Sequence, residues 1–312
     1  MTKVFIDGSA GTTGLRIRQR LEGRKELELL TLPEELRKDA SARKEAMNRA
    51  DIVFLCLPDA AAVEAVTLVE NPAVCVIDTS TAHRTVPGWV YGFPELIGKE
   101  KIASASRIAN PGCHASGFIA LVRPLTEAGL LEKDAALSCF SLTGYSGGGK
   151  SMIAQYEDPA RDPLLDAPRQ YALGQQHKHL KEMTVLCSLT KAPIFCPIVA
   201  DYYSGMEVTV PLFAHQLKGS VGDVKAAYRA AYTGRLVRFE EGCDEDGFLS
   251  AKAFAGCDDM EISVSGNEER ILLTARFDNL GKGASGAAIQ NMNIRLGLEE
   301  TEGLSLKLGE NI

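Results

Sequence analysis

One cysteine lies in a sequence context that favours a reactive thiol. Cys113 follows Asn110-Pro111-Gly112 and precedes His114-Ala115-Ser116-Gly117, between a run expected to be a strand and a pattern expected to be a helix. The helix dipole stabilises a thiolate at a helix N-terminus and so lowers the thiol pKa. The other cysteines lie in apolar runs or acidic loops, at positions 56, 75, 139, 187, 196, 243 and 257. We therefore expect Cys113 to be a nucleophile and the others to be structural or incidental thiols.

A pair of histidines offers a base for this thiol. His177 and His179 lie two residues apart, followed by Glu182. On a strand or extended loop both imidazoles would face the same side, and the carboxylate could orient one of them. A metal pair or a solvated basic loop is the alternative, but no cysteine or third histidine nearby completes a zinc site, so we predict no metal. His114 adjoins the nucleophile but on a helix points about 100° away, which makes it the weaker candidate.

A glycine-rich segment after the first apolar run predicts a dinucleotide site. Its spacing is Gly-x-x-Gly-x-x-Gly rather than Gly-x-Gly-x-x-Gly, so a glycine-rich turn without a ligand is the alternative. Such glycines allow backbone amides and a helix N-terminus to approach a pyrophosphate. The residues expected to bind the cofactor are Gly8, Ser9, Ala10, Gly11, Thr12, Thr13 and Gly14.

The end of the second apolar run favours NADP over NAD. An acidic residue commonly holds the ribose 2′-hydroxyl there. Here Leu29 to Leu32 contains no acid, Glu34 and Glu35 arrive late, and Arg37 and Lys38 follow closely. We also expect Ser80, in the segment after the fourth run, to reach a ligand at the carboxyl edge of the sheet.

A third glycine cluster, from Thr143 to Lys150, follows a predicted strand in the second half. Backbone amides, hydroxyls and a lysine there could hold an anionic group that is not part of the cofactor. The spacing is not that of a Walker motif, and a flexible loop without a ligand is the alternative. The candidate anion-binding residues are Ser146, Gly147, Gly148 and Lys150.

The length and the pattern of apolar runs predict an α/β protein of two domains, which must position these candidate residues. Residues 1–112 alternate apolar runs with helical patterns, as in a Rossmann-like parallel sheet. The expected strands are 4–6, 27–32, 52–57, 74–77 and, more weakly, 102–105, and the expected helices are 12–22, 34–49 and 59–70.

Residues 113–283 predict an α+β catalytic and dimerisation domain with a mixed or largely antiparallel sheet. Its expected strands are 136–143, 184–189, 194–199, 205–212, 260–265 and 270–277, its helices are 114–128 and 221–232, and 158–170 is the most loop-like stretch. A helix over 286–298 belongs to a C-terminal segment, 284–312, that we expect to join the first domain.

Composition excludes several classes of partner. The chain has 312 residues, 45% of them hydrophobic, and a net charge of −7. An acidic chain without a basic block is a poor candidate for nucleic acid or an anionic membrane surface. No apolar run reaches the roughly 20 residues of a membrane span, the N-terminus has no signal-peptide pattern, and no Cys-x-x-Cys pair occurs. We therefore expect a cytosolic protein with reduced thiols.

The chain resembles the N-acetyl-gamma-glutamyl-phosphate reductases, specifically their shorter subclass, within the aspartate-semialdehyde dehydrogenase superfamily. The resemblance covers essentially the whole length, and its most specific parts are Asn110-Pro111-Gly112-Cys113 and the segment from Asn279 to Gly286. It also includes Gly8 to Gly14, Asp78 to Arg84, Thr143 to Lys150, His177 to Glu182 and Gln290 to Asn293. The chain departs from the usual family pattern at Ser80 to Arg84 and at Lys178, both of which look like features of the short subclass.

The resemblance implies a reaction of arginine biosynthesis. Cys113 would attack N-acetylglutamyl 5-phosphate, phosphate would leave, and NADPH would reduce the thioester to the semialdehyde, with His179 as acid and base. It implies that Asn279 and Lys282 lie near the nicotinamide, and that the chain forms a homo-oligomer, a dimer or tetramer. It also implies that Arg84 or Arg107 binds the substrate phosphate or carboxylate, and that Asn110 and Glu182 belong to the substrate site.

Four other functions remain open from the sequence. An aspartate-semialdehyde dehydrogenase or an aminoadipyl-phosphate reductase of the same superfamily would share the thiol and cofactor chemistry. A Rossmann-type NADP-binding regulatory protein would have no catalysis. A dehydrogenase without a covalent intermediate would leave Cys113 and its flanking glycines unexplained.

Overall fold

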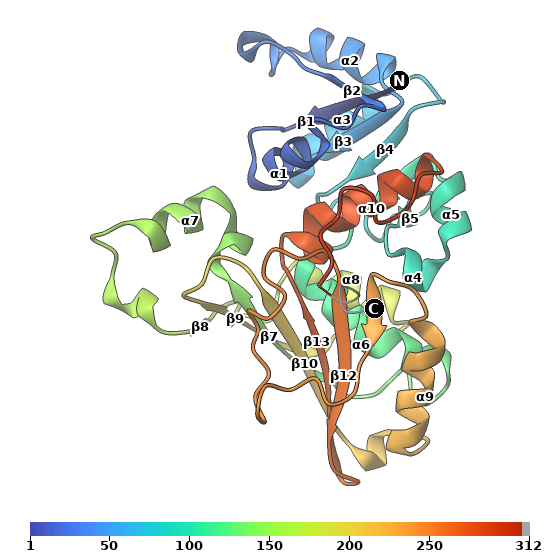
Figure 1. Cartoon of the computed structure of the whole chain (residues 1–312), viewed down its shortest axis with the longest axis vertical. Helices are drawn as coiled ribbons and strands as arrows, with labels where there is room; N and C mark the ends of the chain where they lie inside the picture. The colour runs from blue at the N-terminus through green and yellow to red at the C-terminus, as the bar shows by residue number, and fades with distance from the viewer. Residues whose placement is uncertain (308–312) are drawn as a thin grey trace. The chain divides into compact units, whose positions relative to one another are not determined.

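The computed structural model describes residues 1–307, which divide into two compact units (Figure 1). Unit 1 comprises Met1–Pro111 and Ala284–Leu304, and unit 2 comprises Gly112–Gly283 and a C-terminal segment that begins at Ser305. The first domain was expected to contain everything after residue 284, and this is wrong for the last described residues. Ser305 donates its backbone N–H to Asp258 at 2.9 Å and accepts from the N–H of Asp258 at 2.7 Å, which ties the segment to unit 2. Residues 308–312 lie outside the described part.

Unit 1 is built on a six-stranded sheet in the order β2-β1-β3-β4-β6-β5. Every pair of neighbouring strands is parallel, as the alternating pattern predicts. The strands are β1 (Thr2–Asp7), β2 (Leu27–Leu30), β3 (Ile52–Leu55), β4 (Cys75–Asp78), β5 (Val90–Tyr91) and β6 (Arg107–Ala109). The chain passes from β1 to β2 on one side of β1 and then crosses to β3 on the other side. In parallel α/β sheets a ligand crevice forms at the carboxyl ends of the strands where the strand order reverses in this way.

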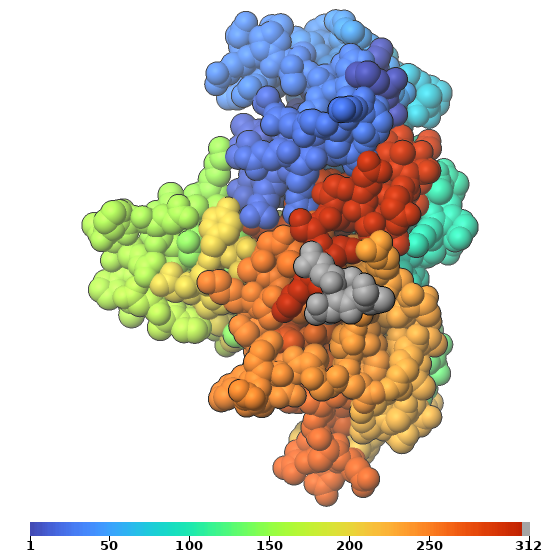
Figure 2. Space-filling model, in the orientation of Figure 1, coloured from blue at the N-terminus to red at the C-terminus, as the bar shows by residue number. Residues whose placement is uncertain are grey.

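Helices cover both faces of this sheet. On one face α1 (Thr12–Leu21), α5 (Lys99–Ser104) and α10 (Gly286–Arg295) bury their apolar side chains together. On the other face α2 (Ala40–Arg49) and α3 (Asp59–Thr67) do the same. Figure 2 shows the C-terminal part of unit 1, in red, packed against its N-terminal part, in blue. The last helix is therefore an integral part of the nucleotide-binding fold, although residues 112–283, which precede it in the chain, belong to unit 2.

Two predicted elements of unit 1 are wrong. The weak strand expected over 102–105 is part of helix α5, and the strand lies just after it, at β6. The single helix expected over 34–49 is a 3-10 turn, η1 (Glu34–Leu36), followed by α2. The break falls where Asp39 caps α2 by accepting a hydrogen bond from the N–H of Ala42 at 2.7 Å, because an N-cap residue has a non-helical backbone.

Unit 2 contains a mixed seven-stranded sheet in the order β11-β12-β13-β10-β7-β9-β8. The β11–β12 and β7–β9 pairs are parallel and the other pairs are antiparallel. The strands are β7 (Ser138–Gly144), β8 (Arg169–Gln170), β9 (Ile194–Ala200), β10 (Met206–Phe213), β11 (Val237–Phe239), β12 (Met260–Gly266) and β13 (Arg270–Phe277). The mixed sheet confirms the predicted fold class of the second domain.

The buried helix α6 (Cys113–Glu127) packs on β10 and β13, beside α8 (His179–Leu186) and α9 (Val221–Ala231). Its seat depends on Gly117, where a Cβ would lie 2.5 Å from Cγ2 of Val208. The strand expected over 184–189 is wrong, because residues 184–186 belong to α8 and Cys187 is its C-cap. Leu180, Met183 and Cys187 are buried at the spacing of one helical face.

The remaining elements are short. They are α4 (Pro94–Ile97), α7 (Gly149–Glu157), the 3-10 turns η2 (Tyr145–Gly148), η3 (Pro163–Asp166) and η4 (Ala214–Gln216), and one π-helical turn, η5 (Gly281–Ser285). Among residues 1–307, no helix has the length and apolar character that crossing a bilayer requires.

Candidate active site

The structure places Cys113 at the first position of α6, as expected from the sequence. Gly112 precedes it in extended conformation as the N-cap, and the thiol residue is half-buried. The π-helical turn η5 packs against it, because a Cβ added to Gly283 would lie 3.0 Å from Cβ of Cys113. A side chain at position 283 would displace the cysteine. Gly283 therefore lets the backbone of η5 lie directly beside Cys113.

Glu182 fastens the start of α6 to α8. Its side chain is 2% exposed, and Oε1 accepts a hydrogen bond from the backbone N–H of Gly112 at 2.9 Å. That N–H is one of the four that an α-helix leaves without an intrahelical partner. The structure therefore gives this carboxylate a contact with the start of the helix that carries Cys113, which the sequence did not predict.

The two histidines of the predicted pair are neighbours, but not on a strand. His179 is the first residue of α8 and is buried, and His177 precedes the helix. Their ring centroids are 4.7 Å apart, and Nδ1 of His177 accepts a hydrogen bond from the backbone N–H of His179 at 3.2 Å. Burial, with the charge of Lys178 adding to it, lowers the pKa of His177 to about 4. At neutral pH His177 is therefore uncharged, with its proton on Nε2.

His114 lies between Ser141 and Tyr171, within hydrogen-bonding distance of both, and its ring is close to both rings of this pair. Its Nδ1 is 2.7 Å from Oγ of Ser141, and its Nε2 is 2.7 Å from the hydroxyl of Tyr171. The His114 ring lies 5.7 Å from that of His177 and 5.6 Å from that of His179. Burial, reinforced by the neighbouring His177, lowers the pKa of His114 to about 3. His114 is thus a neutral packing and hydrogen-bonding group, and no sequence pattern pointed to Tyr171.

The glycine cluster after β7 is a turn held from within, followed by exposed residues. Ser146 is buried, and its Oγ accepts from Nδ2 of Asn279 at 3.0 Å. Oδ1 of Asn279 accepts from the backbone N–H of Gly205 at 3.0 Å, so both ends of this amide bind unit 2. Lys282 is also buried, in η5. The exposed members of the cluster are Gly147, Gly148 and Lys150, the last in α7.

The first glycine cluster has the geometry of a phosphate loop. Gly8 has φ +86°, and a Cβ there would lie 2.3 Å from the carbonyl oxygen of Cys56. A Cβ on Gly14 would lie 2.4 Å from the carbonyl oxygen of Gly8. Gly11, the N-cap of α1, is different, because its nearest neighbour would be 3.5 Å away. The fold requires the two outer glycines, whereas the bare backbone at Gly11 stays open to a ligand at the helix N-terminus.

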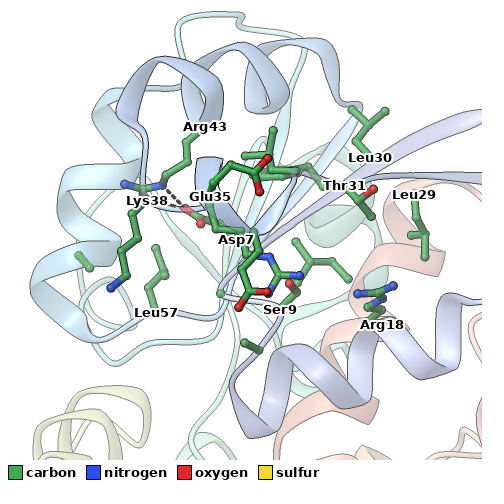
Figure 3. Close-up of a pocket in the computed structure, with 18 residues that line it drawn as sticks. Asp7, Ser9, Arg18, Leu29, Leu30, Thr31, Glu35, Lys38, Arg43 and Leu57 are labelled. Carbon is green, nitrogen blue, oxygen red and sulfur yellow. Dashed lines mark hydrogen bonds and ion pairs between the residues drawn. The ribbon is translucent and has the colours of Figure 1, made fainter.

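A pocket of about 680 Å³ continues from this loop along the ends of β1 and β2 (Figure 3). Thr31 lies in the pocket wall, and Arg43 is bound to Asp7 through Nε at 3.1 Å and Nη2 at 2.8 Å. Arg37 and Lys38, also in the wall, have no ion pair among residues 1–307. Arg37 and Lys38, the two cations that the sequence analysis singled out, therefore line the pocket and could bind an anionic group of a ligand.

The segment after β4 is tightly held. Ser80 donates from its hydroxyl to Oδ2 of Asp78 at 2.7 Å, and Nδ1 of His83 lies 2.6 Å from the same oxygen. Arg84 is buried and donates to the backbone carbonyls of Asn110, at 2.9 Å, and Thr79, at 3.2 Å. The sequence motif therefore contains a buried carboxylate–imidazole pair that the pattern alone did not reveal.

The assignment of Arg107 as a substrate contact is not supported. Arg107 is the first residue of β6, and its Nη1 donates to the carbonyls of Val74, at 3.1 Å, and Ser106, at 2.9 Å. These atoms lie at the amino ends of β4 and β6, whereas ligands of parallel α/β sheets bind at the carboxyl ends. Arg107 and Asn110 are close in sequence, but β6 begins at Arg107 and ends just before Asn110. Its three residues place Arg107 at the amino-terminal edge of the sheet and Asn110 at the carboxyl-terminal edge.

Two family models match the chain, one in each unit. The semialdehyde dehydrogenase NAD binding domain matches residues 33–105, and the semialdehyde dehydrogenase dimerisation domain matches residues 113–279. The chain is therefore built from the two domains of a semialdehyde dehydrogenase.

Curated relatives narrow this class. N-acetyl-gamma-glutamyl-phosphate reductase 2 of Pseudomonas putida is 46% identical, and the match covers 96% of this chain and 98% of the relative. The N-acetyl-gamma-glutamyl-phosphate reductase of Burkholderia lata is 47% identical and covers 94% of this chain and 96% of its own. The N-acetyl-gamma-glutamyl-phosphate reductase of Brucella ovis is 46% identical, and the match covers 95% of this chain and 99% of the relative. The chain belongs to the N-acetyl-gamma-glutamyl-phosphate reductases within the semialdehyde dehydrogenase family.

Solved structures of the same fold are much more distant in sequence. Aspartate semialdehyde dehydrogenase II of Vibrio cholerae, complexed with ASA, has a TM-score of 0.69 at 15% identity and covers 95% of this chain and 98% of its own. The aspartate semialdehyde dehydrogenase of Candida albicans with NADP has a TM-score of 0.64 at 15% identity, over 96% and 100%. At this identity the likeness establishes the fold alone.

Cys113 should be alkylated by iodoacetamide at neutral pH before the other thiols. Burial raises the pKa of Cys56 to about 12 and that of Cys75 to about 11, and it also raises the pKa values of four others, Cys139, Cys187, Cys243 and Cys257. Peptide mass spectrometry after short labelling times measures the order. Cys113→Ser should remove the fast phase, and Cys196→Ser, at another half-buried thiol, should keep it. Equal labelling of all eight cysteines would contradict the assignment.

Proposed function

We propose that the protein reduces N-acetylglutamyl 5-phosphate to N-acetylglutamate 5-semialdehyde with release of phosphate, a step of arginine biosynthesis. One observation carries the proposal: the half-buried thiol of Cys113 begins a helix whose first turn is bound to the helix that begins with His179. The relatives named above, at 46–47% identity over nearly the whole chain, support the choice of substrate.

Cys113 performs covalent catalysis in this proposal. Its thiolate attacks the acyl carbon, a C–S bond forms, and the C–O bond to phosphate breaks so that inorganic phosphate leaves with the electron pair. The product is a thioester, which accepts hydride, whereas a free carboxylate does not. At the end of the cycle the C–S bond of the reduced intermediate breaks, the aldehyde leaves, and the thiolate is regenerated. The amino end of α6 favours the anionic sulfur at both steps.

His179 is the residue that we assign to proton transfer. It would take the thiol proton before attack and handle the proton of the intermediate that collapses to the aldehyde. His177 is unsuited to this role, because its Nδ1 is occupied by the His179 N–H and a pKa of about 4 makes the ring a weak proton acceptor. His177 instead packs against the His179 ring and bonds to its backbone, which orients the base.

Unit 1 would hold the cofactor. The loop from Gly8 to Gly14 would receive the pyrophosphate at Gly11 and at the amino end of α1, and the pocket beyond it would receive the adenosine part. When bound, NADPH supplies the hydride that reduces the thioester. We assign recognition of the 2′-phosphate to Arg37 and Lys38, because Arg43 is engaged by Asp7.

The remaining sequence candidates stay proposals for substrate and nicotinamide recognition. Ser146, Gly147, Gly148 and Lys150 offer hydroxyl, amide and ammonium donors after β7, and Lys282 adds an ammonium group next to Gly283, which contacts Cys113. The bonds described for Ser80, Arg84 and Asn279 go to protein groups, so they shape the walls of the site. Glu182 holds the nucleophile's helix.

We also propose that the protein forms a homodimer through the open face of the seven-stranded sheet. Helix α6 packs on the face of this sheet that carries Val208, and α8 and α9 contact α6. The side chains of Phe140, Ile194, Phe213 and Leu272 alternate with buried residues, share the opposite face and are 41–60% exposed. A second copy would bury this apolar face, and the name of the matching dimerisation domain supports that partner.

Assays with three semialdehydes test the substrate. Purified protein with NADP and phosphate should oxidise N-acetylglutamate semialdehyde far faster than aspartate semialdehyde or aminoadipate semialdehyde, and NADPH formation at 340 nm measures each rate. Cys113→Ser should abolish turnover and retain cofactor binding, because the cofactor residues lie in unit 1. No activity with the first substrate and activity with another would overturn the proposal.

His179→Asn should lower kcat by about two to four orders of magnitude, since that is the usual contribution of a general acid–base group. His177→Asn should cost much less, because an amide can still accept the N–H of residue 179. The pH profile distinguishes the two roles: the His179 variant should lose one limb of the profile, whereas the His177 variant should keep it. Loss of that limb in the His177 variant alone would reverse the assignment.

Arg37→Ala combined with Lys38→Ala should raise the KM for NADPH by about tenfold or more, since charge-assisted hydrogen bonds contribute about 1.5–3 kcal/mol each. The KM for NADH should hardly change, because NADH has no 2′-phosphate. Arg18→Ala is the matched control, since Arg18 lines the same pocket but is paired with Glu22 at 2.8 Å. Equal loss with both cofactors would contradict the assignment.

A further inference from the structure

Two buried asparagines lie where unit 1 continues into unit 2. The chain leaves unit 1 after Pro111 and re-enters it at Ala284, and Asn110 bonds across these two connections. Its Nδ2 donates to the carbonyl of Ala284 at 2.9 Å. The asparagine of the Asn-Pro-Gly-Cys motif thus ties one connection to the other, although more than 170 residues separate them in sequence.

Asn110 is held at every polar group. Its backbone N–H donates to the carbonyl of Asp78 at 2.8 Å, and its own carbonyl accepts from Nε of Arg84 at 2.9 Å. Its Oδ1 faces Nδ2 of Asn291 at 3.3 Å. These bonds use both ends of the side-chain amide within unit 1, so they favour a structural task for Asn110 over the direct substrate contact expected from the resemblance.

Asn291, on α10, is the residue behind Asn110. It is fully buried, and its Nδ2 also donates to the carbonyl of Gly92 at 2.9 Å. A Cβ at Gly92 would lie 2.4 Å from that nitrogen, so the chain leaves room for this side chain and no more. Two oxygens face the nitrogen, which fixes the orientation of the amide because only an NH2 group can donate to both.

This orientation has a cost. Oδ1 of Asn291 has no hydrogen-bond partner among residues 1–307, although it is buried. A buried polar atom without a partner destabilises the folded state. Stability therefore does not explain an asparagine at this position, and its two donated bonds point to a positioning task.

We propose that Asn291 is a positioning residue for the reaction: through Asn110 it fixes the two segments by which the chain passes between the cofactor-binding unit and the unit that carries Cys113. Cys113 follows one connection by two residues, and Lys282 precedes the other by two. In unit 2 the same segments touch at Gly283 and Cys113. The inference rests on the proposed function, because it matters only if a cofactor in unit 1 must reach a thioester in unit 2.

Asn291→Ala tests this, with Asn293→Ala as the matched control. Asn293 is also fully buried on α10, but its Nδ2 donates to the carbonyls of Glu300 and Glu302, away from both connections. Amide hydrogen–deuterium exchange needs no cofactor. In the Asn291 variant we expect faster exchange in peptides that span 107–118 and 281–288, and in the control we expect no change there.

Kinetics give the second readout. Asn291→Ala should lower kcat by about 10- to 100-fold, the cost of slight misplacement of reacting groups. The isotope effect with semialdehyde that carries deuterium on its aldehyde carbon should rise, because hydride transfer becomes rate-limiting. NADPH binding and Cys113 alkylation should stay unchanged, since each depends on one unit, and the control should show no larger isotope effect.

The outcomes are distinct. Exchange in both segments and an isotope effect equal to those of the control would overturn the inference. If the alanine variant does not fold, Asn291→Ser, which keeps a short donor and leaves a smaller void, replaces it and must show the same pattern. Wild-type protein without reductase activity would overturn the proposed function, and the exchange measurement would still decide whether Asn291 holds the two connections.

Discussion

Close packing around the start of α6 leaves no room for a side chain at Gly117 or at Gly283, and the rest of the candidate site depends on that packing. Gly117 lets the helix sit on Val208, and Gly283 lets the π-helical turn lie against Cβ of Cys113. Glu182 then binds the N–H of Gly112 and brings α8, with His179 at its first position, to the same place. Backbone packing and the Glu182 bond therefore set where Cys113 and the start of α8 lie.

Electrostatics at this site are local. The chain carries a net charge of −7, yet the proposed substrate and cofactor are both anions. Helix N-termini, bare glycine amides and a few lysines and arginines must therefore do the binding. His114 and His177 are kept neutral by burial, so they bring no positive charge to this part of unit 2.

The sequence was informative where a residue type is rare and its neighbours are unusual. Cys113 between a strand and a helix, the glycine loop after β1 and the histidine pair could each be recognised, and both sheets were expected in the correct class. Residue spacing alone could not show that His179 begins a helix, because Val185, Leu186 and Cys187 form an apolar run that also suits a strand. The burial of Leu180 and Met183 on one helical face decides it.

Other features depend on contacts between distant segments, which a single sequence does not reveal. Arg107 is close to Asn110 in sequence, yet three residues of strand carry it to the opposite edge of the sheet. Tyr171 reaches His114 across 57 positions, and Asn291 reaches Asn110 across 181. Asn110 was expected to contact substrate, and its side-chain bonds to Ala284 and Asn291 could not be seen in the sequence.

The central claim is the covalent role of Cys113, and trapping of the acyl-enzyme tests it most directly. Protein without NADPH would be mixed with N-acetylglutamyl 5-phosphate generated in situ from N-acetylglutamate and ATP by a kinase, quenched in acid and analysed by peptide mass spectrometry. The account predicts an N-acetylglutamyl group on the peptide that contains Cys113, released by hydroxylamine and absent from Cys113→Ser. Unmodified Cys113 in protein that turns over normally once NADPH is added, or turnover by Cys113→Ala, would contradict it.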